Sequence, residues 1–381
     1  MMERRLYRAE AFGLAAKLRS VSWLYVTLLA LLAAVGYVAL YSAGGGPQPF
    51  ANRHALRFAV GLVILLATAL TDLRLIQRLA WPLYGLGVGL LLAVARFGHV
   101  GKGAQRWIEI GAFQLQPSEL MKIFLVLALA SWFRRASWER VGNPFFLLPP
   151  ALASAVPVVL ILKQPNLGTA VITALVAGVV FFAAGVRWWK FALIALTIAL
   201  AAPLAYHHLH DYQRARIETF LHPESDPLGT GYNIIQSKIA LGSGGLWGKG
   251  FLHGTQGHLD FLPEKQTDFI FTVLAEEFGL IGALSLLGLI TLIIAGGFVI
   301  ALRARDPFGR LVAIGITTNY SLYVFVNLAM VMGAIPVGGV PLPLVSHGGS
   351  ALLTTMFGFG LLLSVEVHRD AASERDEREP L

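Results

Sequence analysis

The sequence predicts an all-α polytopic membrane protein, a bundle of about ten transmembrane helices in a single integral-membrane domain, 1–381. Of its 381 residues, 56% are hydrophobic and only 14% are charged, whereas a soluble domain carries about 25% charged residues. The mean hydropathy of +0.66 excludes a disordered chain. The absence of cysteine excludes a disulfide scaffold, a thiolate metal site and a cysteine nucleophile.

Ten apolar runs approach the length that a membrane span requires. The hydrocarbon core of a bilayer is about 30 Å thick, so a helix needs roughly 20 apolar residues to cross it. The first run is longer than the apolar core of a cleaved signal peptide, and we expect it to be retained. The runs lie at 21–41, 54–71, 80–96, 118–133, 145–162, 168–185, 188–206, 269–301, 311–333 and 344–366.

The basic residues between these runs predict the orientation. The net charge is +8, but the Lys and Arg residues cluster in the even-numbered connections, counting the N-terminal segment as zero. This pattern is typical of membrane topology rather than of nucleic-acid binding, and it predicts that both termini are cytoplasmic. The clusters are Arg4, Arg5, Arg8, Lys17 and Arg19; Arg74 and Arg78; Arg134, Arg135 and Arg140; Arg187 and Lys190; Arg303, Arg305 and Arg310.

The longest connection, 207–267, is predicted to be a large external loop between spans seven and eight. Long loops in compact proteins are usually functional. Apolar residues at helical spacing in Tyr232–Leu241 predict a short helix near the membrane surface, and Gly242–Gly250 predicts a glycine-rich turn. The segment 367–381 mixes both charge signs and is predicted to be a cytoplasmic tail.

Ionisable residues near the spans are the first candidates for function, because they are costly in a membrane. Glu119 and Lys122 lie three residues apart at the start of the fourth span, in the segment Gln116–Lys122, and therefore share one helix face. They form either a structural ion pair at a helix start or part of a polar cavity. The spacing alone favours neither.

Asp268 lies where the external loop meets the eighth span. Thr267 or Asp268 could cap that helix, or Asp268 could serve as a general base at the membrane surface. Further along the same run, Glu276 and Glu277 are adjacent acids, and we interpret them as structural.

Further polar groups gather in the external segments. Lys102, Arg106 and Trp107 lie in one short loop, a composition typical of an interface anchor. The prolines and glycines of Pro341–Ser350 require surrounding protein or a cavity at membrane depth. No Walker A motif, zinc motif or Ser-His-Asp pattern is present.

Several of these segments resemble the SEDS family (shape, elongation, division and sporulation proteins). The longest matching block is DPLGTGYNIIQSKIALGSGG at 226–245, and His253–Gln256 is closer to the elongation branch of the family than to the division branch. Two positions depart from the family pattern, since Asn166 stands where Asp is usual and His347 where Tyr is usual. The other matching segments are 105–107, 116–122, 262–264, 267–269 and 341–350.

The resemblance implies a peptidoglycan glycosyltransferase of the bacterial inner (cytoplasmic) membrane that polymerises lipid II during cell elongation. It implies Asp268 as the essential aspartate, a central cavity lined by Glu119 and Lys122, and a class B penicillin-binding protein as partner. Membrane lipid is a further expected partner, and nucleic acid is not.

The implied reaction inverts the configuration at the sugar carbon, so it requires a base for the acceptor hydroxyl and stabilisation of the departing pyrophosphate. Asp268 could supply the first, and Arg106, Lys102, Lys249 and Lys265 are candidates for the second. No protein cage for a metal is evident, and a divalent cation bridging the pyrophosphate stays open. Two other classes also stay open: a flippase for the lipid-linked precursor, and a non-enzymatic scaffold for a penicillin-binding protein.

Overall fold

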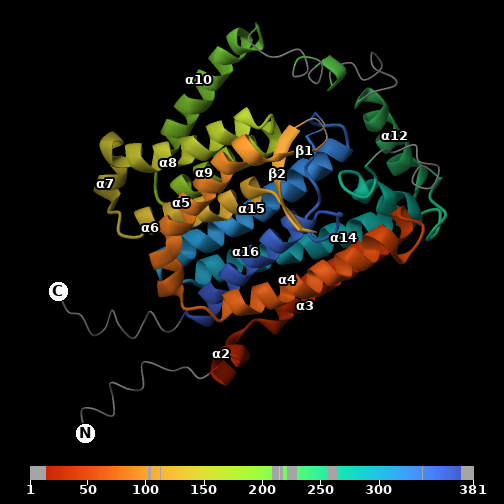
Figure 1. The fold of residues 1–381 in the computed structure, drawn as a ribbon, viewed down its shortest axis with the longest axis horizontal. Helices are drawn as coiled ribbons and strands as arrows, with labels where there is room; N and C mark the ends of the chain where they lie inside the picture. Colours follow the sequence, from red (N-terminus) through yellow and green to blue (C-terminus); the bar gives the residue numbers. More distant parts are fainter. Residues whose placement is uncertain are drawn as a thin grey trace.

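The computed structural model describes residues 14–369 except 102–103, 112, 208–213, 215–217, 221–229, 256–263 and 337. It is a bundle of long helices (Figure 1), and a helix is present at each of the ten predicted runs. These helices are α3 (Trp23–Ala43), α4 (Asn52–Ala69), α5 (Leu73–Phe97), α6 (Pro117–Phe133), α8 (Pro144–Lys163), α9 (Leu167–Ala183), α10 (Trp188–His207), α14 (Ile270–Arg303), α15 (Pro307–Val331) and α16 (Gly349–Val367).

Seven helical segments are long and apolar enough to span a membrane, as judged by length and composition within the described residues. The other three of the ten are α6, α9 and α10. Helix α9 and the segment Trp188–Ala201 of α10 are shorter apolar helices, and α6 has 17 residues, the lower end of the spanning range. Four shorter helical elements complete the described chain: α2 (Leu14–Ser20), η2 (Pro47–Ala51), α7 (Trp138–Gly142) and α12 (Thr230–Ser243).

Local sequence signals set where several helices begin. Asp72, Asn143, Asn166 and Asp306 each accept a hydrogen bond from a main-chain N–H in the first turn of the helix that follows. Helices α6, α8 and α15 each have proline in the first turn, where the missing N–H is no loss. The helix starts are therefore specified locally, before any packing.

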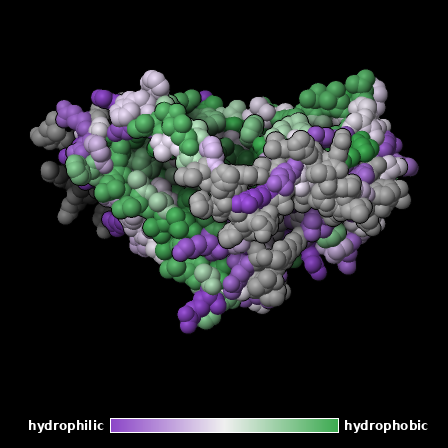
Figure 2. All heavy atoms as spheres, turned by 90° about the horizontal axis from the view of Figure 1, so that it is seen from above, coloured by the Kyte–Doolittle hydropathy of each residue, from purple (hydrophilic) through white to green (hydrophobic). Residues whose placement is uncertain are grey.

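The core lies around α16, α15 and α6. Helix α16 packs against α4, α14 packs against α15 and α3, and α6 packs against α5. Small residues allow close approach: Gly360 faces the main chain of Leu65, and Gly315 faces Val126. Apolar side chains cover much of the described outer surface in Figure 2, with polar groups in smaller patches, as expected for a protein surrounded by lipid.

A small antiparallel sheet precedes α6, in a segment for which the sequence predicted only a loop. Its strands are β1 (His99–Gly101), β2 (Ala104–Ile110) and β3 (Phe113–Leu115), in the order β1-β2-β3. The aromatic and β-branched residues of Trp107–Ile110, followed by Gly111, were a strand-and-turn signal. The all-α prediction holds for the bundle, and the sheet is an addition to it.

Helix α14 is broken at Gly279, whose φ of +65° lies in the left-handed region that glycine tolerates. The break releases main-chain groups, and the predicted glycine-rich turn satisfies them. Leu280 and Ile281 donate N–H groups to the oxygens of Gly245 and Leu246 at 2.9 and 3.3 Å. In return, Lys249 and Gly250 donate to the oxygens of Glu276 and Glu277, both at 3.0 Å.

The prediction of a short helix in Tyr232–Leu241 is confirmed by α12. Its buried Ser237 hydroxyl donates to the oxygen of Val331 at 2.8 Å and lies 2.9 Å from the Thr272 hydroxyl, which ties α12 to α15 and α14. By contrast, α10 projects from the bundle (Figure 1), and no described residue of α10 is buried within the chain. That helix is left to contact lipid or another protein.

Candidate active site

Asp268 lies just before α14, and its side chain is partly exposed. The residue that caps α14 is Phe269, with no side-chain cap hydrogen bond, which rules out the alternative that Thr267 or Asp268 caps this helix. Instead, Thr267 donates from its hydroxyl to the Glu264 carboxylate at 2.9 Å. The cap position of α14 therefore lies one residue after Asp268.

The main chain around Asp268 is held from two neighbouring elements. The Asn327 amide of α15 donates to the oxygen of Asp268 at 2.9 Å and to the oxygen of Val340 at 2.7 Å. His347 donates its main-chain N–H to the oxygen of Gln266 at 2.7 Å. The aspartate therefore lies on a segment fixed against both α15 and the loop that precedes α16.

The Asp268 carboxylate faces that same loop. A Cβ atom added at Gly339 would lie 3.8 Å from Asp268 Oδ2, so the carboxylate approaches the main chain without a clash. The loop itself is well packed, since Leu342, Leu344, Val345 and Ser346 are buried. This confirms that the proline- and glycine-rich segment lies against protein.

Glu119 and Lys122, which their spacing placed on one helix face, form a buried ion pair. Lys122 Nζ lies 2.9 Å from Glu119 Oε1, and the two residues are 1% and 7% exposed. Tyr323 completes the cluster, because its hydroxyl donates to Glu119 Oε1 at 2.6 Å and its ring centroid lies 3.9 Å from Lys122 Nζ. A buried charge pair is tolerated only with such additional partners.

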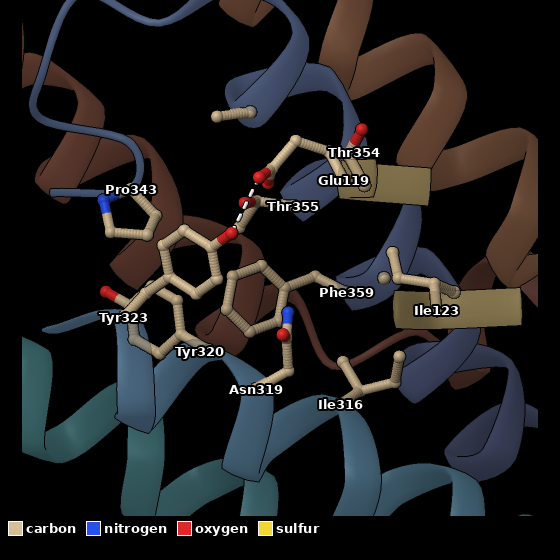
Figure 3. A pocket seen from close by; sticks show the side chains of 12 residues that line it. Glu119, Ile123, Ile316, Asn319, Tyr320, Tyr323, Pro343, Thr354, Thr355 and Phe359 are labelled. Atoms are coloured by element: carbon tan, nitrogen blue, oxygen red, sulfur yellow. Dashed lines mark hydrogen bonds between the residues drawn. The ribbon is translucent and has the colours of Figure 1, made fainter. Parts of the chain in front are cut away.

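A small cavity opens beside this cluster. Figure 3 shows the Glu119 carboxylate and the Tyr323 hydroxyl pointing toward one another at its edge. Its volume is about 10 Å³, close to the room that one water molecule needs. Asn319, Tyr320 and Thr354 also line it. Lys122 does not line it and instead lies against Glu119 and the ring of Tyr323.

Helix α15 joins the two polar groups. Tyr323 contacts the Glu119–Lys122 pair, and Asn327, four residues later on the same face, contacts the Asp268 segment. One helical turn rises about 5.4 Å, so the two clusters lie about one turn apart along α15. Neither residue was predicted from the sequence, because inside the spans only charged groups were candidates for function. Their position in an otherwise apolar run was the available signal.

Two of the four candidate cations are bound to other protein groups. Arg106 donates to the main-chain oxygens of Gln164, at 3.1 Å, and Pro165, which fixes β2 to the turn between α8 and α9. Lys249 Nζ lies 2.7 Å from Glu276 Oε1.

Three candidate residues remain: Lys265, Trp107 and Lys102. Lys265 is partly exposed three residues before Asp268, and Trp107 is partly exposed on β2. Lys102 lies outside the described residues.

Glu276 and Glu277 make structural contacts beside the break in α14, in agreement with their interpretation as structural residues. Glu276 Oε1 also accepts the main-chain N–H and the hydroxyl of Thr255, at 2.9 and 3.0 Å. The Ser42 hydroxyl of α3 donates to Glu277 Oε1. These contacts attach the loop that follows α12 to the helix that begins beside Asp268.

No group of three or more His, Asp or Glu side chains close enough to hold a metal ion occurs within the described part of the chain. The described residues therefore do not form a protein cage for a divalent cation.

Asn166, one of the two departures from the family pattern, caps α9. Its side-chain oxygen lies 3.4 Å from the main-chain nitrogen of Thr169.

The chain is similar to known proteins over most of its length. The family model FTSW_RODA_SPOVE, described as cell cycle proteins, matches residues 18–371. Peptidoglycan glycosyltransferase MrdB of Escherichia coli K12 is 46% identical over 91% of this chain and 94% of its own. A probable peptidoglycan glycosyltransferase FtsW of Idiomarina loihiensis is 36% identical over 90% and 86%. The higher identity to MrdB agrees with the resemblance to the elongation branch.

Solved structures agree with this relationship. One, described as the structural coordination of polymerization and crosslinking by a peptidoglycan synthase complex, matches with a TM-score of 0.80 and 36% identity over 92% of this chain and 98% of that chain. The rod shape determining protein RodA of Thermus thermophilus matches with a TM-score of 0.70 and 31% identity over 92% and 97%. The fold, the extent of the match and the identities together place this chain in the FtsW/RodA/SpoVE family of cell cycle proteins.

Proposed function

We propose that the protein is a peptidoglycan glycosyltransferase that joins lipid II molecules into glycan strands, with Asp268 as the general base. The observation that carries the proposal is a partly exposed carboxylate, one residue before the cap position of α14, on a segment fixed by Asn327 and His347. The relationship to MrdB, a peptidoglycan glycosyltransferase, supports the reaction class.

The proposed reaction is one inverting displacement. The acceptor sugar hydroxyl attacks the anomeric carbon of the donor sugar, the bond from that carbon to the lipid diphosphate breaks, and the diphosphate leaves with the electron pair. Asp268 accepts the proton of the hydroxyl. A base must lie within hydrogen-bond reach of the proton it removes, and the fixed main chain on both sides of Asp268 supports such positioning.

The proposed setting is the bacterial inner membrane with both termini in the cytoplasm, which places Asp268 on the external side. The distribution of Lys and Arg supports this orientation. A class B penicillin-binding protein is the proposed partner. The similarity to a structure of a peptidoglycan synthase complex supports association with another synthase component, and the unburied face of α10 offers a surface for it.

A flippase is the second candidate function, and the buried Glu119–Lys122–Tyr323 cluster is the observation that favours it. Transport of a charged headgroup requires polar groups through the depth of the bundle. The cluster instead lies at the start of α6, near the level of the Asp268 segment. That position is more consistent with substrate binding at one face. A pure scaffold is the third candidate and makes no use of Asp268.

A divalent cation is proposed only as an ion that binds together with the substrate. Because the described side chains offer no three-ligand cage, such an ion would require the diphosphate itself as a major ligand. Polymer formation measured with and without a chelator tests it.

The test of the proposed function is polymerisation of purified lipid II by the purified protein, alone and with its partner. Glycan strands that depend on the partner support a glycosyltransferase activated in a complex. Translocation of lipid II across vesicles without polymer formation would identify a flippase. No activity of either kind, combined with stable partner binding, would identify a scaffold.

A further inference from the structure

Arg57 is a further cation at the end of the bundle where the Asp268 segment lies, and it is not one of the four candidate cations named from the sequence. Arg57 lies in the second turn of α4, and its side chain is half-buried. Its guanidinium Nη1 lies 3.3 Å from His347 Nε2. In the described part of the chain, no carboxylate forms an ion pair with Arg57.

His347 orients this guanidinium. A guanidinium can only donate, so Nε2 of the imidazole is the acceptor. The imidazole is neutral in this arrangement, because a protonated ring has no acceptor nitrogen. The ring of Phe50 packs edge-on against His347, with the centroids 5.0 Å apart, and this contact fixes the orientation of the imidazole.

The position of Arg57 is electrostatically unfavourable without an anion. A Cβ added at Gly349 would lie 2.9 Å from Arg57 Cζ, so the guanidinium lies against the first turn of α16. That helix end has no side-chain cap hydrogen bond, and the positive end of a helix disfavours cations and favours anions. Arg57 and the helix end therefore share one electrostatic requirement, which an anionic ligand would meet.

The site lies next to the Asp268 segment. The main-chain N–H of His347 donates to the oxygen of Gln266, two residues before Asp268. The same residue thus contacts Arg57 through its ring and the aspartate segment through its main chain. An anion held by Arg57 would lie beside the proposed general base, as the diphosphate of a lipid-linked sugar must during the reaction.

We propose that Arg57, oriented by His347 at the N-terminus of α16, binds the diphosphate of the polyprenyl-linked substrate. This inference rests on the proposed function. It adds a diphosphate-binding residue to the four candidate cations that the sequence suggested. Arg57 is the binding group. His347 is a positioning residue, because it acts through Arg57.

Binding can be measured apart from catalysis. The probe is undecaprenyl diphosphate in phosphatidylcholine nanodiscs that contain the full-length protein. Two further arms use phosphatidylglycerol, an anionic headgroup without a diphosphate, and soluble inorganic pyrophosphate. Because hydrogen bonds to charged groups are strong, Arg57→Gln is expected to weaken binding of undecaprenyl diphosphate about tenfold or more, while Arg57→Lys, which keeps the charge, weakens it less.

Arg96→Gln is the matched control, since Arg96 is an exposed arginine in the last turn of α5 and no role is proposed for it. His347→Phe keeps the aromatic contact with Phe50 but removes the acceptor, and a severalfold loss of affinity is expected. For polymerisation, Arg57→Gln is expected to raise KM for lipid II more than it lowers kcat. The unfolding temperature of each variant verifies that it is folded.

Equal affinity of folded Arg57→Gln and wild-type protein for undecaprenyl diphosphate would overturn the inference, even if the wild type polymerises lipid II. Equal loss of affinity for phosphatidylglycerol would also overturn it, by showing a general anionic-lipid site. Diphosphate binding that depends on Arg57 in a protein that makes no polymer would support the site and contradict the proposed function.

Discussion

The amide of Asn327 donates to the main-chain oxygen of Asp268 at 2.9 Å. A second hydrogen bond from the same nitrogen, at 2.7 Å, reaches the oxygen of Val340. One buried side chain of α15 thus joins the aspartate segment to the loop before α16. Because Asn327 contacts no more than the main chain of Asp268 in these bonds, its role is to position the residue.

Asn327→Leu is expected to lower kcat about 10–100-fold with a smaller change in KM, because misplacement of a reacting group by about 1 Å can cost that much. Two carbonyl groups would lose their donor, which destabilises the fold by about 1–3 kcal/mol. Steady-state kinetics with lipid II measure the first effect and thermal unfolding the second. Asn52→Leu, at an exposed position, is the control. An unchanged kcat in folded Asn327→Leu would show that this hydrogen bond does not position Asp268.

Lys122→Ala is expected to be strongly destabilising. It would leave Glu119 buried without its cation, with only the Tyr323 hydroxyl as a described partner, and loss of one member of a buried pair costs about 3–5 kcal/mol. Lys163→Ala, at the exposed end of α8, should have little effect. Thermal unfolding in detergent compares the two. Equal unfolding temperatures would mean that the pair is solvated in the native protein.

Gly279→Ala tests the break in α14. The positive φ and extended ψ of Gly279 are essentially confined to glycine and cost another residue about 1–3 kcal/mol, and the added Cβ would also meet the main chain of Gly248. Gly288, in the same helix, has no neighbouring atom within 4 Å of an added Cβ, so Gly288→Ala is expected to be neutral or slightly stabilising. A lower unfolding temperature for Gly279→Ala alone is the expected result. Equal unfolding temperatures would show that α14 does not need this break.

The orientation is tested by reporters on the two sides of the membrane. A reporter fused after Leu381 is expected to read cytoplasmic, and one inserted near His222 is expected to read external, because the positive connections remain inside. The opposite result at either position would place Asp268 on the wrong side for the proposed reaction.

The helices could be predicted from the sequence because each one follows from local information. Apolar runs give their lengths, and residues such as Asp72 and Asp306 cap their starts. Spacing alone also placed Glu119 beside Lys122, since a separation of three residues is a helical property.

Contacts between distant segments could not be predicted in this way. Lys249 pairs with Glu276 across 27 residues, and Arg57 meets His347 across 290. Such pairs depend on how the helices pack, which periodicity does not encode. The sequence left Thr267 and Asp268 open as caps of α14, whereas the cap position is Phe269, whose side chain is buried.

The most direct test of Asp268 as the general base is lipid II polymerisation by purified Asp268→Asn protein with its partner. The change keeps the size of the side chain and the main-chain contact to Asn327, but it removes the base. General-base catalysis contributes about 10²–10⁴-fold, so polymer formation is expected to fall by at least the lower figure while folding and partner binding are unchanged. Asp306→Asn, which preserves a capping residue at the start of α15, should retain activity. Polymerisation by folded Asp268→Asn at a rate near wild type would show that Asp268 is not the general base.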